Sequence, residues 1–299
     1  MAKSLSGKVV AITGGARGIG KATAEALVAK GARVALGDID EGLVAQTASE
    51  IGADTIGLKL DVTDINSFEA FLVATEDLLG PLDVLINNAG IMPLGDFVEE
   101  KESTAQRMIA INLNGVIFGS RLALRRFIPR GSGHLVNVAS TAGKFGAPGG
   151  ATYSATKHAV VGLSEALRRE VKENGIDVSI VMPLAVNTDL GSGLADTRGL
   201  KVLQPEDVAK KIVRALETGK VDVYVPSWIG SFLRSQGVVP RRFADFLTHA
   251  LGGDQVLMHP DPALRGAYEA KVTGADQPTS EAPKAPDAPE RDEQSASVA

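Results

Sequence analysis

The chain has 299 residues, of which 44% are hydrophobic and 22% charged, and this composition excludes a wholly disordered or fibrous protein. It contains no cysteine, which excludes disulfides and thiolate chemistry and fits a cytoplasmic location. The net charge is −5, and because four of these charges fall after residue 273, the nearly neutral body gives no electrostatic reason to bind nucleic acid. No secretory signal or membrane-spanning run is visible in the sequence.

Short apolar runs alternate with helical patterns along the first 225 residues. In chain order, strands are expected at 8–13, 33–36, 55–60, 83–87, 133–139, 177–182 and 221–225, and helices at about 19–30, 41–51, 65–79, 101–127, 151–173 and 205–217. Continuous apolar strands joined by helices of crossover length are typical of a parallel sheet covered on both faces. The pattern predicts a Rossmann-type, doubly wound α/β fold with a mostly parallel seven-stranded sheet in one domain, residues 1–227.

Two segments of different character follow this domain. Residues 228–273 include Phe243, Phe246, Leu247, Ala250 and Leu251 at helical spacing, which predicts an amphipathic helix in an extension packed on the domain. This helix packs on its own domain or another subunit, covers an apolar substrate, or contacts a membrane; the lack of a basic cluster disfavours the membrane. Residues 274–299 are acidic, proline-rich and nearly devoid of large apolar side chains, so we expect a disordered tail.

A glycine-rich turn connects the first predicted strand to the first helix, with the sequence Gly14-Gly15-Ala16-Arg17-Gly18-Ile19-Gly20. Glycines at these positions permit a tight turn and allow the backbone to approach a pyrophosphate, which the free N–H groups at the start of a helix hold. The spacing is Gly-x-x-x-Gly-x-Gly rather than the commoner Gly-x-Gly-x-x-Gly. Its position after the first strand predicts a dinucleotide site.

Asp38 ends the second predicted strand, 18 residues after Gly20. A carboxylate at this place accepts both hydroxyls of the adenosine ribose and repels a 2′-phosphate, which favours NAD over NADP. Arg17 argues the other way, because a cation in the glycine-rich turn can bind that phosphate. Since the carboxylate would directly oppose the phosphate charge, we expect NAD as the cofactor, with NADP second.

Tyr153 and Lys157 are four residues apart in a predicted helix, so their side chains share one face. A free tyrosine has a pKa near ~10, which is too high for a base at neutral pH. A neighbouring ammonium group favours the phenolate, so we expect Lys157 to lower the pKa of Tyr153 and make it an acid/base group. Ser140 follows a strand thirteen residues earlier and is placed to hydrogen-bond a substrate oxygen.

These motifs occur in a characteristic order: Thr13-Gly14-x-x-x-Gly18-Ile19-Gly20, Asn87-Asn88-Ala89-Gly90, Asn112, Ser140 and Tyr153-x-x-x-Lys157. Over about residues 5–225 the chain thereby resembles the short-chain dehydrogenase/reductase family. The resemblance implies four catalytic residues, Asn112, Ser140, Tyr153 and Lys157, with Asn112 holding a water that links Lys157 to solvent. For Asn87 a structural role, tying adjacent strands together, is the better interpretation.

The resemblance also implies the cofactor-binding residues. Beside Gly14, Arg17, Gly18, Ile19, Gly20 and Asp38, they are Asp61 and Val62 at the adenine, Asn88, Ala89 and Gly90 at the adenosine ribose, Tyr153 and Lys157, and Val186 and Thr188 at the nicotinamide. The family usually has Pro-Gly after the sixth strand, whereas this chain has Pro183-Leu184. We expect Leu184 to narrow the reacting end or to change the pose of the cofactor.

Three weaker features complete the reading. Residues 191–203 are glycine-rich and favour a mobile substrate lid over a plain loop. The four histidines, His134, His158, His249 and His259, have no partner at metal-ligand spacing, so we expect no catalytic metal. The family resemblance implies a homodimer or homotetramer that pairs through helices 101–127 and 151–173.

The leading hypothesis is therefore an oxidoreductase that transfers a hydride between a nicotinamide cofactor and a secondary alcohol or ketone, with Tyr153 as acid/base. Leu184 and four aromatic residues, Trp228, Phe232, Phe243 and Phe246, suggest a bulky, apolar substrate of steroid-, retinoid- or long-chain type. A sugar-nucleotide epimerase or dehydratase shares the Tyr–Lys pair but resembles a longer chain with another glycine spacing. A dinucleotide sensor without turnover has no need of the complete set of catalytic residues.

Overall fold

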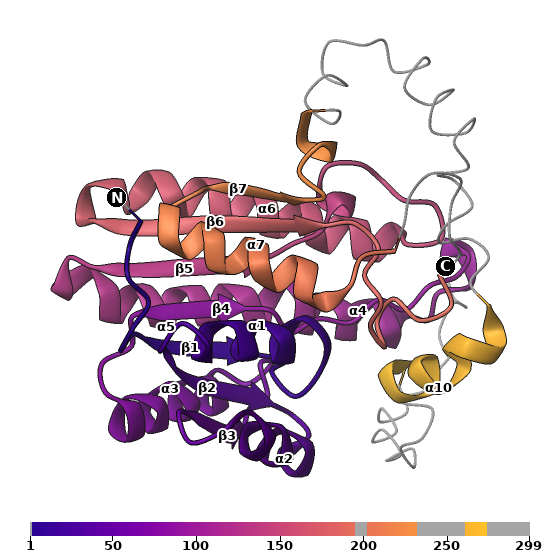
Figure 1. Cartoon of the computed structure of the whole chain (residues 1–299). Coiled ribbons are helices and arrows are strands. Elements are labelled where there is room, and N and C mark those ends of the chain that lie inside the picture. Colours follow the sequence, from indigo (N-terminus) through magenta and orange to yellow (C-terminus); the bar gives the residue numbers. More distant parts are fainter. Residues whose placement is uncertain (1, 195–201, 232–260, 274–299) are drawn as a thin grey trace, which may run out of the picture.

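The computed structural model describes residues 2–194, 202–231 and 261–273 (Figure 1). Seven strands form one sheet in the order β3-β2-β1-β4-β5-β6-β7, and every neighbouring pair is parallel. Their bounds are β1 Val9–Thr13, β2 Arg33–Asp38, β3 Thr55–Lys59, β4 Val84–Asn87, β5 Gly133–Val138, β6 Ile176–Pro183 and β7 Asp222–Val225. The predicted doubly wound α/β fold is confirmed.

Helices cover both faces of this sheet. One face packs against α1 (Gly18–Val28), α2 (Glu41–Ile51) and α7 (Pro205–Thr218), and the other against α3 (Ile65–Leu79), α5 (Gly115–Arg130) and α6 (Ala151–Glu170). Along β1, Val10 and Ile12 belong to the first apolar layer, while Val9 and Ala11 belong to the second, as the two-residue repeat of a strand requires. Apart from the edge strand β3, which is mostly half-buried, the strands are largely buried on both faces, which is why their sequences read as continuous apolar runs.

The prediction of one uninterrupted α-helix at 101–127 is wrong, because a π-helical turn interrupts it. The structure divides it into α4 (Glu102–Ile109), a π-helical turn (Ala110–Asn114) and α5. Within the turn, the Asn112 side chain donates to the Ile91 carbonyl at 2.8 Å and accepts from the Ile91 N–H at 2.8 Å. A π turn holds one more residue than an α turn and so aims Asn112 differently. The apolar spacing of the sequence shows no break at this place.

A chain of buried polar side chains ties α6 to the sheet. The Asn87 amide on β4 donates to Asn137 Oδ1 on β5 at 2.9 Å, and the Asn137 amide donates to Ser164 Oγ on α6 at 2.9 Å. All three residues are buried, so removing one partner would leave unpaired polar groups inside the protein. The structural role expected for Asn87 is confirmed, and the same links hold the helix that carries Tyr153 and Lys157.

Beyond the sheet, the structure describes a helix that the sequence did not predict, α10 (Pro262–Thr273), at the same end of the molecule as α4 (Figure 1). The amphipathic helix expected around 243–251, the acidic tail 274–299 and residues 195–201 of the expected lid lie outside the described residues. Among the helices that are described, none is long and apolar enough to cross a membrane.

Candidate active site

The carboxyl ends of β1, β4, β5 and β6 bring the predicted motifs to one edge of the sheet. The strand order reverses between β1 and β4, and ligands of doubly wound sheets bind in the crevice beside such a point. The glycine-rich turn follows β1 and residues 88–90 follow β4. Ser140 lies just beyond β5, and Leu184 begins the segment after β6.

The first turn of α1 has no capping side chain. Its N-cap residue, Arg17, makes no side-chain capping bond, whereas Asp40 caps α2 and Asp64 caps α3 through their carboxylates. The amide groups that begin α1, including those of Ile19 and Gly20, are therefore free of a capping side chain and carry the positive end of the helix dipole. Such a helix start is a ready-made phosphate site.

The glycines are required by close backbone packing. Gly14 and Gly18 have φ angles of +64° and +53°, and a methyl group on Gly20 would lie 2.2 Å from the Gly14 carbonyl oxygen. The Asn88 side chain donates to the carbonyl oxygens of Thr13 at 2.9 Å and Gly14 at 3.0 Å. The side-chain amide of Asn88 thus stabilises the glycine-rich turn, and both of these hydrogen bonds are made to backbone carbonyls.

Asp38, which is expected at the adenosine ribose, is held by two backbone N–H groups. Asp38 accepts from the N–H of Ala16 in the glycine-rich turn at 3.2 Å and from the N–H of Asp40 at 3.2 Å. Arg17, the cation that argued for NADP, pairs with Asp189 at 3.1 Å and with Asp40 at 3.6 Å. Its charge is therefore balanced by two carboxylates of the protein itself.

The other residues expected at the cofactor follow β3 and β6. Asp61 follows β3 and accepts from the N–H and hydroxyl of Thr63 at 2.9 and 2.7 Å. The next residue, Val62, is buried beside Gly115, where a methyl group would come within 3.1 Å of its side chain. A methyl group on Gly18 would lie 3.0 Å from Thr188 Cγ2, so the nicotinamide segment expected at 186–188 does meet the glycine-rich turn.

Tyr153 and Lys157 lie on the buried face of α6. The Lys157 ammonium donates to the carbonyl of Val138, at the end of β5, at 3.0 Å and lies 5.7 Å from the centre of the Tyr153 ring. Ser140 Oγ accepts from the Ala142 N–H at 3.1 Å and thereby caps the short 3-10 turn after β5. A methyl group on Gly90 would lie 3.2 Å from Asn112 Oδ1 and 3.6 Å from Lys157 Nζ, so both side chains lie close to Gly90.

Burial controls the titration of this pair. It raises the pKa of Tyr153 to about 12, although a side-chain hydrogen bond with Ser140 works in the opposite direction. Burial also lowers the pKa of Lys157 to about 8, because a charged ammonium is less well solvated there than in water. Burial thus acts against the lowering of the Tyr153 pKa that was expected from Lys157, and that effect of Lys157 stays a prediction.

Leu184 contributes to the core. It packs against the apolar cluster that includes Val160, Ile180, Tyr224 and Ile229, and its N–H donates to the Val225 carbonyl at 2.9 Å. These contacts extend the pairing of β6 with β7 by one residue. They give no support to the expectation that Leu184 narrows the reacting end.

Sequence reasoning missed two residues beside the site, Arg265 and Tyr268 on α10. Arg265 is only 2% exposed and donates to the carbonyl of Met92, and Tyr268 Oη accepts from the Met92 N–H at 2.7 Å. Met92 packs in one apolar cluster with Tyr153. The only sequence signal was a proline followed by a polar face of Arg265, Tyr268 and Glu269 at spacings of three and four.

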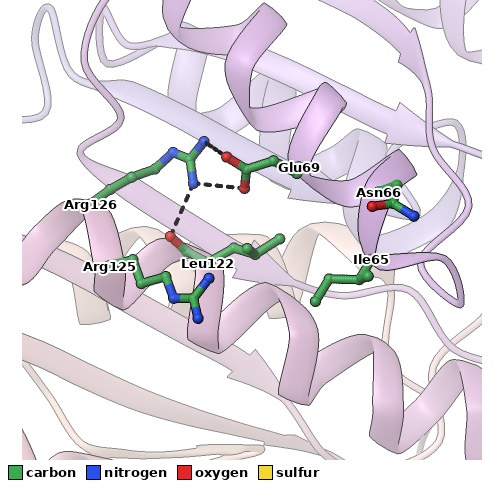
Figure 2. Close-up of a pocket in the computed structure, with 6 residues that line it drawn as sticks. All are labelled: Ile65, Asn66, Glu69, Leu122, Arg125 and Arg126. Carbon is green, nitrogen blue, oxygen red and sulfur yellow. Dashed lines mark hydrogen bonds and ion pairs between the residues drawn. The ribbon is translucent and has the colours of Figure 1, made fainter.

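Metal-ligating groups, His134 and a hollow between two helices are the other features that bear on function. Within the described part of the chain, no group of three His, Asp or Glu side chains is placed to hold a metal ion. His134 is buried, and its ring shares a hydrogen bond of 2.8 Å with Ser179. A hollow of about 530 Å³ lies between α3 and α5 (Figure 2), but it shares no lining residue with the Tyr153 site. Its most buried cation, Arg126, is paired with Glu69 and Glu76, each at 2.8 Å.

Known proteins resemble this chain over most of its length. A family model described as short chain dehydrogenase matches residues 8–199. The 2,5-dichloro-2,5-cyclohexadiene-1,4-diol dehydrogenase LinX of Sphingobium indicum is 34% identical over 74% of this chain and 86% of its own length. The 3-oxoacyl-[acyl-carrier-protein] reductase FabG of Vibrio harveyi is 34% identical over 70% of this chain and 90% of its own.

A solved structure from the same family is also similar to this chain. It is a short chain dehydrogenase/reductase from Burkholderia phymatum in complex with NAD, with a TM-score of 0.71 and 27% identity. The match covers 78% of this chain and 93% of that one. The helix α10 lies beyond the residues that the family model matches.

The buried ammonium of Lys157 makes stability depend on pH in a predictable way. The pKa of Lys157 is about 8 in the folded protein, below the value of ~10.4 in the unfolded chain. The folded protein is therefore more stable above the unfolded pKa, where Lys157 is neutral, and this extra stability is lost as the pH falls through about 8. Lys157→Met removes this dependence. We expect the free energy of unfolding of the variant, relative to the unmodified protein, to fall by roughly 2 kcal/mol between pH 7.5 and 10.

Urea unfolding at several pH values measures this difference. Lys59→Met is the matched control, because the Lys59 side chain is 62% exposed and its removal has no buried charge to relieve. The Lys59 difference should stay constant over the same range. A Lys157 difference that is equally constant would contradict the burial argument.

Proposed function

The chain belongs to the short-chain dehydrogenase family, and from this we propose that it is an NAD-dependent oxidoreductase that interconverts secondary alcohols and ketones. The observation that carries the proposal is the gathering of Ser140, Tyr153 and Lys157 at the same sheet edge as the glycine-rich turn. That edge provides both a phosphate-binding helix start and a group able to transfer a proton.

The residues present fit the dinucleotide that the family implies. The uncapped start of α1 suits the pyrophosphate, and Asp38 suits the ribose hydroxyls. Val186 and Thr188, on the segment that touches Gly18, suit the nicotinamide end. When bound, the nicotinamide accepts or supplies the hydride.

The protein's own part in the reaction is to hold and move a proton at Tyr153 Oη. Because burial raises the pKa of Tyr153 to about 12, its hydroxyl is protonated at neutral pH and ready to be donated to a ketone oxygen. Ser140 holds that oxygen by a hydrogen bond. The Lys157 ammonium lies beside the Tyr153 ring and is positively charged when protonated. This charge favours the Tyr153 phenolate, which accepts a proton when an alcohol is oxidised.

The charges around the ribose site support NAD. Asp38 and Asp40 are both carboxylates, and a 2′-phosphate placed beside them would be repelled. Arg17 is the cation that could offset this repulsion, but it is paired with Asp40 and Asp189. The proposal of NAD therefore rests mainly on Asp38, because Asp40 is already paired with Arg17.

We also propose that the substrate carries a large apolar group. The support comes from the apolar side chains around Tyr153 rather than from the aromatic residues of the C-terminal extension. Tyr153 lies in an apolar cluster with buried and half-buried side chains of Ile91, Met92, Leu94, Met108, Ala142, Leu190 and Leu194. Of the aromatic residues first considered, Trp228 is 54% exposed, and Phe232, Phe243 and Phe246 lie outside the described residues. The names of the relatives, a chlorinated cyclic diol dehydrogenase and a carrier-bound oxoacyl reductase, do not agree on one substrate.

Removal of the Tyr153 hydroxyl tests the proposed reaction. We expect Tyr153→Phe to lower kcat by about 10² to 10⁴-fold while NAD still binds, because the ring stays and only the proton donor is lost. Steady-state assays and calorimetric titration of NAD measure the two effects. Tyr224→Phe is the control, since Tyr224 is also buried but packs against Leu184 and Ile229 instead. Near-normal turnover of Tyr153→Phe would reject the mechanism.

Substitutions at Asp38 test the cofactor. Asp38→Ala should weaken NAD binding by about tenfold, through loss of charge-assisted hydrogen bonds, and bring the affinities for NAD and NADP closer together. Asp38→Asn separates repulsion from hydrogen bonding, because the amide keeps polar contacts without the charge. Titration of both dinucleotides gives the ratio. If the unmodified protein binds NADP more tightly than NAD, Arg17 outweighs the two carboxylates and the proposal of NAD fails.

A set of secondary alcohols and ketones tests the substrate body. Transfer of apolar surface from water into the cluster around Tyr153 should raise kcat/KM by about tenfold for every two or so buried methylene groups, so 2-decanone should exceed 2-butanone. The oxidation of 2-decanol, 2-butanol and sorbitol is compared at the same NAD concentration. A higher kcat/KM for sorbitol than for 2-decanol would contradict an apolar site and leave the oxidoreductase assignment intact.

A further inference from the structure

One turn of α10 joins two loops that lie about a hundred residues apart in sequence. The Arg265 guanidinium donates to the carbonyl of Met92 in the loop after β4, and to the carbonyls of Leu190 at 3.2 Å and Ser192 at 2.9 Å in the loop after β6. Its remaining charge is balanced by Glu269, one turn along α10, at 2.6 Å. A single buried side chain therefore holds both loops.

Neighbouring residues of α10 repeat these links. Glu269 accepts from the Leu94 N–H at 3.2 Å, and Tyr268 Oη accepts from the Met92 N–H at 2.7 Å. On the other loop, the Ser192 hydroxyl donates to the Leu264 carbonyl at 2.8 Å. Both backbone polar groups of Met92 thus end on α10, which replaces the partners that a strand or helix would otherwise give them.

The loop after β6 is shaped for this contact. Gly193 has a φ angle of +74°, and its carbonyl accepts from the Asp261 N–H at 2.9 Å. A methyl group on Gly193 would lie 2.9 Å from the Asp261 carbonyl oxygen and 3.3 Å from Arg265 Cβ. Only glycine fits so close an approach with that backbone conformation.

The two loops carry the apolar side chains that surround Tyr153. Met92 and Leu94 come from the first loop and Leu190 and Leu194 from the second, and all four pack in the cluster of Tyr153. A buried guanidinium without its carbonyl partners would be strongly unfavourable, so α10 docks in one register or not at all. The position of these walls relative to Tyr153 therefore depends on α10.

We propose that α10 completes the substrate side of the active site and that Tyr268 is a specificity-determining residue, whose ring closes the apolar wall beside Tyr153. This inference rests on the proposed function, because it assigns the substrate body to the space next to the acid/base group. Tyr268 reaches the apolar cluster of Tyr153 through Met92, whose N–H donates to Tyr268 Oη at 2.7 Å and whose side chain packs in that cluster. Burial raises the pKa of Tyr268. Tyr268 is accordingly neutral at working pH and suits an apolar ligand.

Hydrogen exchange of the full chain tests the docking of α10 without any assay of activity. In Arg265→Met, the amides of 91–94 and 190–194 should exchange at least about tenfold faster, because both loops lose their partner, while those of β1 and α1 are unchanged. Arg214→Met is the matched control, since the Arg214 side chain is 66% exposed and pairs with Glu217, away from both loops. Unchanged exchange in the two loops would overturn the proposal.

Kinetics of Tyr268 variants test the contact with substrate. Tyr268→Ala should raise the ratio of KM for 2-decanone to KM for 2-butanone by about tenfold, as expected for loss of one buried ring contact, with a smaller change in kcat. Tyr268→Phe keeps the ring and loses only the acceptor for the Met92 N–H, so it should recover most of that ratio. Thermal unfolding of each variant shows that it is folded.

The outcomes separate this inference from the proposed function. If the unmodified protein reduces no ketone with either cofactor, the proposed function fails, and hydrogen exchange still decides whether α10 holds the loops. If ketones are reduced and the KM ratio of Tyr268→Ala is unchanged, Tyr268 does not contact the substrate and the inference is overturned. A raised ratio together with faster loop exchange in Arg265→Met supports it.

Discussion

A lysine ammonium buried at the carboxyl end of the sheet is the constraint on which the rest of the site depends. Lys157 is 4% exposed and donates to the carbonyl at the end of β5, and this contact fixes the face of α6 that carries Tyr153. Burying the charge is unfavourable, which is the usual relation between an active site and stability. The links Asn87–Asn137–Ser164 hold α6 on the sheet and so keep Lys157 in this position.

The glycine-rich turn shows the same logic in the backbone. Its positive φ angles place N–H groups at the start of α1, and Asn88 and Asp38 hold it from two sides through hydrogen bonds to its carbonyl and N–H groups. Asn112 has a comparable role between elements, because a π-helical turn aims its amide at the backbone of Ile91. Residues 88–91 are therefore held between the turn and Asn112, and both Asn112 and Lys157 lie close to Gly90.

Helix α10 extends this arrangement beyond the residues that the family model matches. It holds the loops after β4 and β6 from outside through Arg265, Tyr268 and Glu269. The sheet thus positions Ser140, Tyr153 and Lys157, while a segment far along the chain holds the two loops whose side chains surround Tyr153.

The sequence by itself determined the strands of the sheet and the places of the glycine-rich turn, Asp38 and the Tyr153–Lys157 pair. Apolar periodicity and local spacing carry this information, because each involves residues only a few positions apart. The sequence did not show the π-helical turn at Asn112, since one inserted residue leaves the apolar pattern intact. Nor did it show the direction of the Tyr153 pKa, the neutralised charge of Arg17, the core position of Leu184 or the contacts of Arg265. Only the tertiary structure decided these, because each depends on burial or on a partner far away in the chain.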